Sequence, residues 1–77
     1  MNRLLSNLIQ KRVGDMARSL LTEDYRIMTK VKLPTSYFVK LRHKSNGNLI
    51  TIIGSYQNGV IKLMRNGRER HREQVSE

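Results

Sequence analysis

Residues 25–68 have the sequence YRIMTKVKLPTSYFVKLRHKSNGNLITIIGSYQNGVIKLMRNGR. Apolar and polar side chains alternate along most of this stretch, and a period of two predicts half-buried strands. Asn-Gly pairs at 46–47 and 58–59 interrupt the alternation, and this dipeptide accepts the positive φ angles of a tight hairpin turn. Pro34 interrupts it as well, because proline has no N–H to donate to a sheet. The pattern predicts four antiparallel strands that follow one another in chain order.

The lengths of the connecting loops predict which residues face one another. We expect two-residue loops at 46–47 and 58–59. A three-residue loop is expected at 34–36, because a two-residue loop there would place the apolar residues of neighbouring strands on opposite faces. The resulting cross-strand pairs include Leu41 with Ile52, Ile53 with Met64, Val31 with Val39, and Lys30 with Lys40. One face then gathers the apolar residues Ile27, Val31, Leu33, Tyr37, Val39, Leu41, Ile50, Ile52, Ile61 and Leu63.

Residues 3–21 repeat apolar side chains at every third or fourth position, which predicts an amphipathic helix. Its stripe consists of Leu5, Ile9, Val13, Met16 and Leu20. Asn2 is expected to cap the helix by accepting a hydrogen bond from a first-turn N–H. Gly14 fits poorly, because glycine in a helix interior costs about 1 kcal/mol relative to alanine. Arg12 lies on the apolar side, where it would extend to the rim, pair with an acid or contact another subunit.

Together these patterns predict an α+β fold in which the N-terminal helix packs on the apolar face of a four-stranded antiparallel meander. Residues 1–67 form this single domain, as expected for a chain of 77 residues. Residues 68–77 contain one apolar side chain, Val75, which buries too little surface to offset the entropy of ordering the segment. We therefore expect a frayed helix or disorder in this charged tail.

The charge of the chain is concentrated in the predicted strands. Residues 25–68 contain nine Lys and Arg and no Asp or Glu, and the whole chain has a formal net charge of +9. Such a stretch is typical of a surface that binds a polyanion, although a solvated face that opposes aggregation has the same composition. We expect the second sheet face to bind nucleic acid, RNA or DNA, mainly through phosphate groups. The candidate residues are Arg26, Lys30, Lys32, Phe38, Lys40, Arg42, Lys44, Lys62, Arg65 and Arg68.

Several functional classes are disfavoured by composition. The chain has no cysteine, which excludes a zinc knuckle and fits a reducing, cytoplasmic location. Acidic residues occur only near the two ends, so paired carboxylates, a metal site or a cofactor are not expected. No apolar run approaches the roughly 20 residues that span a bilayer. We expect a non-enzymatic protein without catalytic residues.

Two other functions remain open from the sequence. Met28, Phe38, Ile53, Met64 and Leu49 place apolar surface among the basic residues, which favours a protein that docks on an acidic protein or a nucleoprotein complex. The same surface leaves a homodimer open, although the high net charge favours a monomer. A metal-free ribonuclease that uses His43 and Tyr25 with nearby Lys or Arg is the third alternative.

Overall fold

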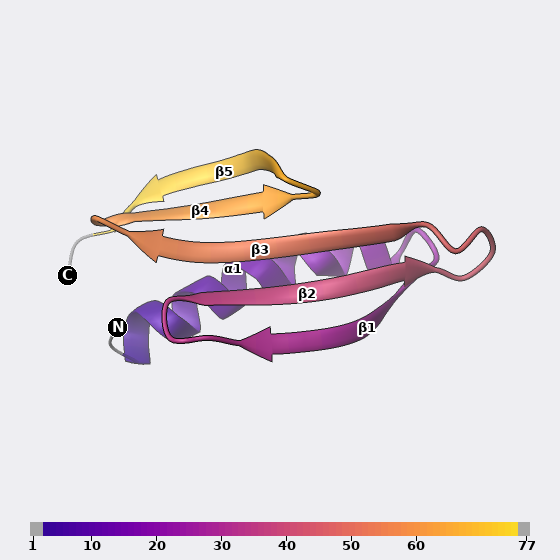
Figure 1. Ribbon diagram of the computed structural model, residues 1–77, viewed down its shortest axis with the longest axis horizontal. Coiled ribbons are helices and arrows are strands. Elements are labelled where there is room, and N and C mark those ends of the chain that lie inside the picture. The colour runs from indigo at the N-terminus through magenta and orange to yellow at the C-terminus, as the bar shows by residue number, and fades with distance from the viewer. Residues whose placement is uncertain (1–2, 76–77) are drawn as a thin grey trace.

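The structure is a computed structural model that describes residues 3–75. A helix, α1, is followed by strands β1 to β5, which form one antiparallel sheet in the order β1-β2-β3-β4-β5 (Figure 1). Their bounds are α1 Arg3–Leu21, β1 Tyr25–Lys32, β2 Ser36–His43, β3 Leu49–Gln57, β4 Val60–Arg65 and β5 Arg68–Gln74. The predicted α+β arrangement of a helix on an antiparallel sheet is confirmed, but the prediction of four strands is wrong because the sheet has five.

The amphipathic pattern of α1 determines which of its sides is buried. Its fully buried residues are Leu5, Ile9, Val13, Ala17 and Leu20, while Met16 is half-buried. The helix is continuous through Gly14, because burial of the stripe on both sides of this residue exceeds the modest penalty of one glycine. The predicted cap, Asn2, lies outside the described residues.

One face of the sheet packs against α1, which runs behind β2 and β3 in Figure 1. We call this side the covered face and the opposite side the open face. The sheet contributes Val39, Leu41, Ile50, Ile52, Ile61 and Leu63 to the core. Gly54 is also buried on the covered face, where a methyl group would lie 2.7 Å from Val13 Cγ2 and 2.8 Å from Ile9 Cγ2. The absence of a side chain at Gly54 therefore lets the helix approach β3 closely.

The fifth strand, β5, occupies residues that the sequence predicted to be a frayed or disordered tail. A third Asn-Gly pair precedes it, and Asn66 and Gly67 adopt φ angles of 50° and 81°, as in a type I′ hairpin turn. The turn returns the chain along β4, whose backbone groups pair with those of β5. Val75 packs against the core, and its N–H donates to the carbonyl of Gly59 at 2.9 Å. Backbone pairing thus orders a segment that has almost no apolar side chains.

The predicted register between β1 and β2 is wrong. The turn contains two residues, Pro34 and Thr35, because Lys32 lies opposite Tyr37 and the N–H of Leu33 donates to the carbonyl of Ser36 at 2.9 Å. A β-bulge, rather than a longer loop, then brings the apolar residues at the start of β1 onto the same face as those of β2. The register shifts between Ile27 and Thr29, so that Met28 is the extra residue.

The bulge divides β1 into two halves with opposite parity. Before it, Ile27 lies on the covered face, as predicted, but its cross-strand partner is Leu41. After it, Lys30 lies opposite Val39 and Val31 lies opposite Phe38, so the predicted pairs Val31 with Val39 and Lys30 with Lys40 do not form. Val31 is consequently on the open face. Lys30 is on the same side of the sheet as α1, but its side chain is exposed at the β1 edge.

The other two predicted hairpins differ in outcome. The pairing of Ile53 with Met64 is confirmed, since Asn58 and Gly59 form a two-residue turn. Between β2 and β3, Leu41 lies opposite Ile50 rather than Ile52, and residues 44–47 form a longer loop. The shift is two residues, which preserves the face on which every side chain of these strands lies.

Candidate anion-binding face

The centre of the open face is an apolar row that crosses four strands. Val31, Phe38, Ile53 and Met64 are successive cross-strand partners from β1 to β4. Direct partners lie on the same face and in contact range, so these four side chains form a continuous band. Val31, Phe38 and Met64 are half-buried, and Ile53 keeps 39% of its surface exposed. The corrected register creates this band, because it brings Val31 beside Phe38.

Basic side chains lie on both sides of the apolar row. Toward the loop between β2 and β3, Lys40 lies between Thr29 and Thr51, and Arg42 lies opposite Arg26. Toward the opposite end of the sheet, Lys62 lies between Ser55 of β3 and Arg72 of β5. The open face is thus an apolar strip with cations along its two borders.

The structure brings together about half of the candidate residues. Arg26, Phe38, Lys40, Arg42 and Lys62 share the open face, and Lys44 lies in the adjoining loop.

The side chains of the remaining four candidates lie on the covered face, where α1 does not bury them: each is exposed or half-buried. Lys30 and Lys32 lie opposite Val39 and Tyr37 as a consequence of the bulge. Arg65 lies opposite Ile52, and Arg68 lies opposite Arg65. The prediction that Lys30 and Lys32 lie on the open face is therefore wrong.

The cations of the open face differ in whether they have an acidic partner. Among residues 3–75, the ion pairs within 4.0 Å are Arg12 with Glu73, Arg18 with Asp15, His71 with Glu73, and Arg72 with Glu69. Arg26, Lys40, Arg42 and Lys62 take part in none of these pairs. The charges of Arg26, Lys40 and Arg42 are available to an external anion, whereas Glu69 partly neutralises Arg72 and also interacts with the charge of Lys62.

Arg72 is a residue of the open face that the sequence did not indicate. Its guanidinium Nη2 donates to Glu69 Oε1 at 2.8 Å, and this hydrogen bond holds the pKa of Glu69 below its usual value. The strand assignment of residues 68–74 is what places Arg72 beside Lys62. The repeated Asn-Gly pair was the signal that could have revealed this strand, because the same dipeptide makes the preceding hairpin.

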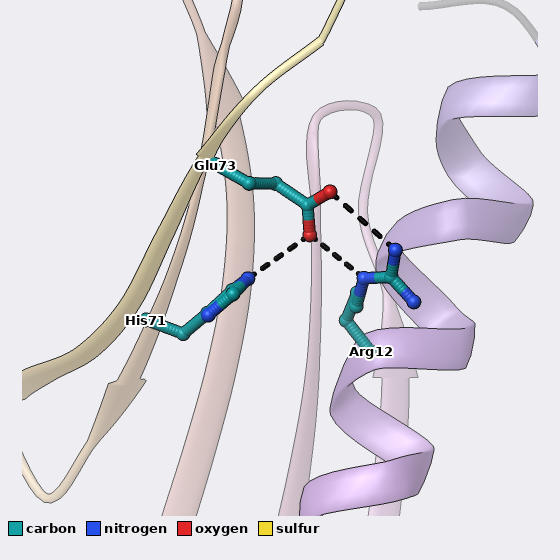
Figure 2. A network of polar contacts seen from close by, with 3 residues as sticks. All are labelled: Arg12, His71 and Glu73. Atoms are coloured by element: carbon teal, nitrogen blue, oxygen red, sulfur yellow. Dashed lines mark hydrogen bonds and ion pairs between the residues drawn. The ribbon is translucent and has the colours of Figure 1, made fainter.

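A second polar cluster lies on the covered face and joins α1 to β5. Arg12 Nε donates to Glu73 Oε1 at 2.7 Å, and His71 Nε2 lies 3.1 Å from the same oxygen (Figure 2). The hydrogen bond from Arg12 is the main cause of a lowered pKa at Glu73, and His71 adds to it. Of the three roles open to Arg12, the structure shows the acid pair, which neutralises this arginine at the border of the core.

The histidine that the sequence offered for catalysis lies at the end of β2. His43 Nδ1 accepts hydrogen bonds from the N–H groups of Ser45 and Asn46, at 3.2 and 3.3 Å. Its ring packs edge-on against Tyr25, with centroids 4.9 Å apart. These contacts give His43 a structural part in the loop between β2 and β3. The described residues contain no cluster of three or more metal-ligating side chains from His, Cys, Asp and Glu.

Within residues 3–75, no helix is both long and apolar enough to cross a bilayer. No protein-family model, curated protein or solved structure matches the chain. Geometry and charge therefore carry the functional inference for this protein.

Proposed function

We propose that this protein binds nucleic acid through its open face, mainly by contacts with phosphate groups, and that it is not an enzyme. One observation carries the proposal: Arg26, Lys40, Arg42 and Lys62 lie on one uncovered surface, and none of them forms an ion pair within 4.0 Å with a carboxylate of residues 3–75. Arg26 and Arg42 are direct cross-strand partners, and like charges in this position destabilise a sheet. A bound polyanion removes that repulsion.

Binding of this kind gains free energy from the release of counterions and carries little sequence information. The apolar row supplies one aromatic ring, Phe38, on which a base can stack. A single ring flanked by aliphatic side chains is a smaller stacking platform than dedicated single-strand binders use. We therefore expect modest affinity, a preference for unpaired strands and little discrimination between sequences.

The test is a titration of RNA and DNA oligonucleotides of unrelated sequence over a range of salt concentrations. Four to six phosphate contacts predict a slope of about −3 to −5 for the logarithm of affinity against the logarithm of salt. Lys40→Ala with Arg42→Ala should reduce this slope and weaken all sequences alike. Arg3→Ala with Lys11→Ala removes the same charge from exposed positions on α1 and is the matched control. Equal effects of the two double variants would assign binding to net charge rather than to the open face.

Phe38 separates base stacking from phosphate binding. Phe38→Ala should weaken single-strand binding by roughly 1 to 3 kcal/mol if a base stacks there, with little change in the salt slope. Duplex binding should change less, because the bases of a duplex are stacked on one another. Equal losses for both forms would indicate that the substitution disturbs the sheet rather than a stacking site.

The apolar row favours docking on an acidic protein as the second candidate function. It spans about 14 Å across four strands, and cations border it on both sides, which complements an apolar ridge flanked by carboxylates. A second copy of this chain fits less well, because the two cationic borders would face each other. Light scattering at moderate salt should show a monomer. Absence of nucleic-acid binding at low salt, together with salt-resistant binding of an acidic protein that Ile53→Asp abolishes, would replace our proposal with this one.

A further inference from the structure

The end of the sheet where β1 begins and β2 finishes contains a hollow of about 590 Å³. In Figure 1 this is the end at which the loop between β2 and β3 projects furthest. Its lining comes from the start of β1, the end of β2 and this loop, and includes Arg26, Arg42 and Lys44 as well as Ile27, Met28 and Asn46. Three cations from three different segments thus surround one space.

Hydrogen bonds hold the wall formed by the loop in place. The N–H of Lys44 donates to the carbonyl of Asp24 at 2.9 Å, which ties the loop to the segment before β1. The side chain of Asn46 accepts from the N–H of Asn48 at 2.9 Å, and His43 Nδ1 accepts from two further loop N–H groups. The loop is therefore organised before any ligand binds, which lowers the entropic cost of binding.

The guanidinium of Arg42 lies against this loop. A methyl group on Gly47 would be 3.6 Å from Arg42 Nη2 and 3.8 Å from Arg42 Nε, which are ordinary contact distances, so the guanidinium lies directly beside the loop residue that lines the hollow. Arg26 approaches from the neighbouring strand as the cross-strand partner of Arg42. None of the three cations forms an ion pair with a carboxylate of residues 3–75. An anion bound here would meet three unneutralised charges.

We infer that this hollow binds the terminal phosphomonoester of a nucleic-acid strand that lies along the open face. The inference rests on the proposed function and names the part of the nucleic acid that the hollow takes. A phosphodiester within a strand carries one negative charge, whereas a terminal phosphomonoester carries about 1.5 to 2 at neutral pH. Three converging cations match the higher charge.

The position of the hollow supports the same conclusion. It lies at one end of the sheet rather than at its centre, beyond the apolar row, and Arg26 and Arg42 of the open face are part of its lining. A strand bound along the open face from Lys62 toward Lys40 can place one of its ends there. Planar guanidinium groups such as those of Arg26 and Arg42 can each donate two parallel hydrogen bonds to phosphate oxygens.

The experiment compares one oligonucleotide of about 12 nucleotides with a hydroxyl at both ends, with a 5′-phosphate and with a 3′-phosphate. We expect one phosphorylated form to bind roughly tenfold more tightly than the hydroxyl form at about 0.1 M salt, from one to two additional charge contacts. The preference should decline as pH falls through about 6, where the dianionic monoester takes up one proton and becomes a monoanion. Inorganic phosphate should occupy the hollow and so reduce the affinity difference between the phosphorylated and hydroxyl forms, without displacing the bound oligonucleotide.

Two variants assign the preference to the hollow. Arg26→Gln with Lys44→Gln should bring the ratio of phosphorylated to hydroxyl affinity close to one. Lys62→Gln removes a cation from the same face at a distance from the hollow, and it should weaken all forms while the ratio is retained.

The outcomes separate this inference from the proposed function. Equal affinity for all three oligonucleotides, or a preference that survives the Arg26 and Lys44 substitutions, overturns the terminal-phosphate inference while nucleic-acid binding stands. Binding of inorganic phosphate without binding of any oligonucleotide overturns both.

Discussion

The two edge strands of the sheet contain the same number of Lys and Arg residues but differ in whether acids lie between them. Both β1 and β5 are mostly exposed, each is rich in basic residues, and each has a register shift next to its neighbour. In β5 the acids Glu69 and Glu73 alternate with the cations and pair with Arg72 and Arg12. In β1 no acid is present, and its cations pair with none of residues 3–75.

Charged edges keep a sheet from extending into other molecules, and that role suffices to explain β5. It explains β1 less well, because no acid compensates the repulsion between Arg26 and Arg42, whereas Glu69 partly compensates that between Lys62 and Arg72 of β5. Basic composition alone therefore does not distinguish a structural edge from a binding edge. The interleaved acids, together with the sheet face on which each cation lies, make that distinction, and the predictions below test it.

The largest expected effect follows removal of β5. A chain that ends at residue 67 loses the ladder to β4, the packing of Val75 and the ion pair of Arg12. Each backbone hydrogen bond contributes about 0.5 to 1.5 kcal/mol, so the loss reaches several kcal/mol and exceeds what a domain this small tolerates. Urea unfolding should show no cooperative transition. A chain shortened only by residues 76–77 is the control, and similar midpoints for both would make β5 a dispensable tail.

The next effect concerns binding and compares the edges directly. Arg26→Gln with Arg42→Gln, and Arg70→Gln with Arg72→Gln, reduce the net charge equally. If each lost phosphate contact lowers the affinity about sixfold at 0.1 M salt, the first pair should weaken oligonucleotide binding about 40-fold and the second only a few-fold. Fluorescence anisotropy measures both. Equal losses would remove the distinction between the edges.

The sequence predicted the parts of this fold that depend on regular periods and two-residue turns. The stripe of α1 and the pairing of Ile53 with Met64 follow from a helical period and an Asn-Gly turn, and both are present. The alternation of apolar and polar residues also predicted that Arg26, Lys40, Arg42 and Lys62 share the open face, because at these four positions the strands keep the predicted inward and outward order.

Where the prediction was wrong, side chains or backbone irregularities determine the outcome. The loop at 44–47 is longer than its Asn-Gly pair suggested, because Asn46 and His43 accept hydrogen bonds from loop N–H groups. The bulge at Met28 has no glycine or other local signal to mark it. The strand β5 gains stability from pairing with β4 and from Glu73 contacting a residue 61 positions earlier, which no local pattern displays.

A smaller effect, on the pH dependence of stability, should arise from Glu73 of β5. Arg12 lowers the pKa of Glu73 in the folded protein below its ordinary value of 4.5. A carboxyl with a lowered pKa in the folded state stabilises the protein above its unfolded pKa, and this contribution is lost as pH falls through the folded pKa. Glu73→Gln should therefore be less stable than the parent near neutral pH, with the difference shrinking below about pH 4.5.

Unfolding in urea at a series of pH values measures this dependence. Arg12→Gln should reproduce the change, and the double variant should add little to either single one. Oligonucleotide affinity at neutral pH should stay within a few-fold of the parent. A difference that persists undiminished at low pH would show that Glu73 stabilises the protein by packing rather than by its charge.

The smallest expected effect lies within β1 and tests the bulge. The alternating sequence places Lys30 and Lys32 beside Lys40, whereas the bulge transfers them to the covered face opposite Val39 and Tyr37. Lys30→Gln with Lys32→Gln should therefore leave the salt slope nearly unchanged and lower affinity only through the general field of the protein, which ions screen within about 10 Å at 0.1 M salt. Lys40→Gln with Lys62→Gln, of equal charge, should lower the slope by about 1.4 to 1.8 through two lost contacts. If the two double variants lower the slope equally, nucleic acid reaches both faces at this edge, and the open face is not the sole binding surface.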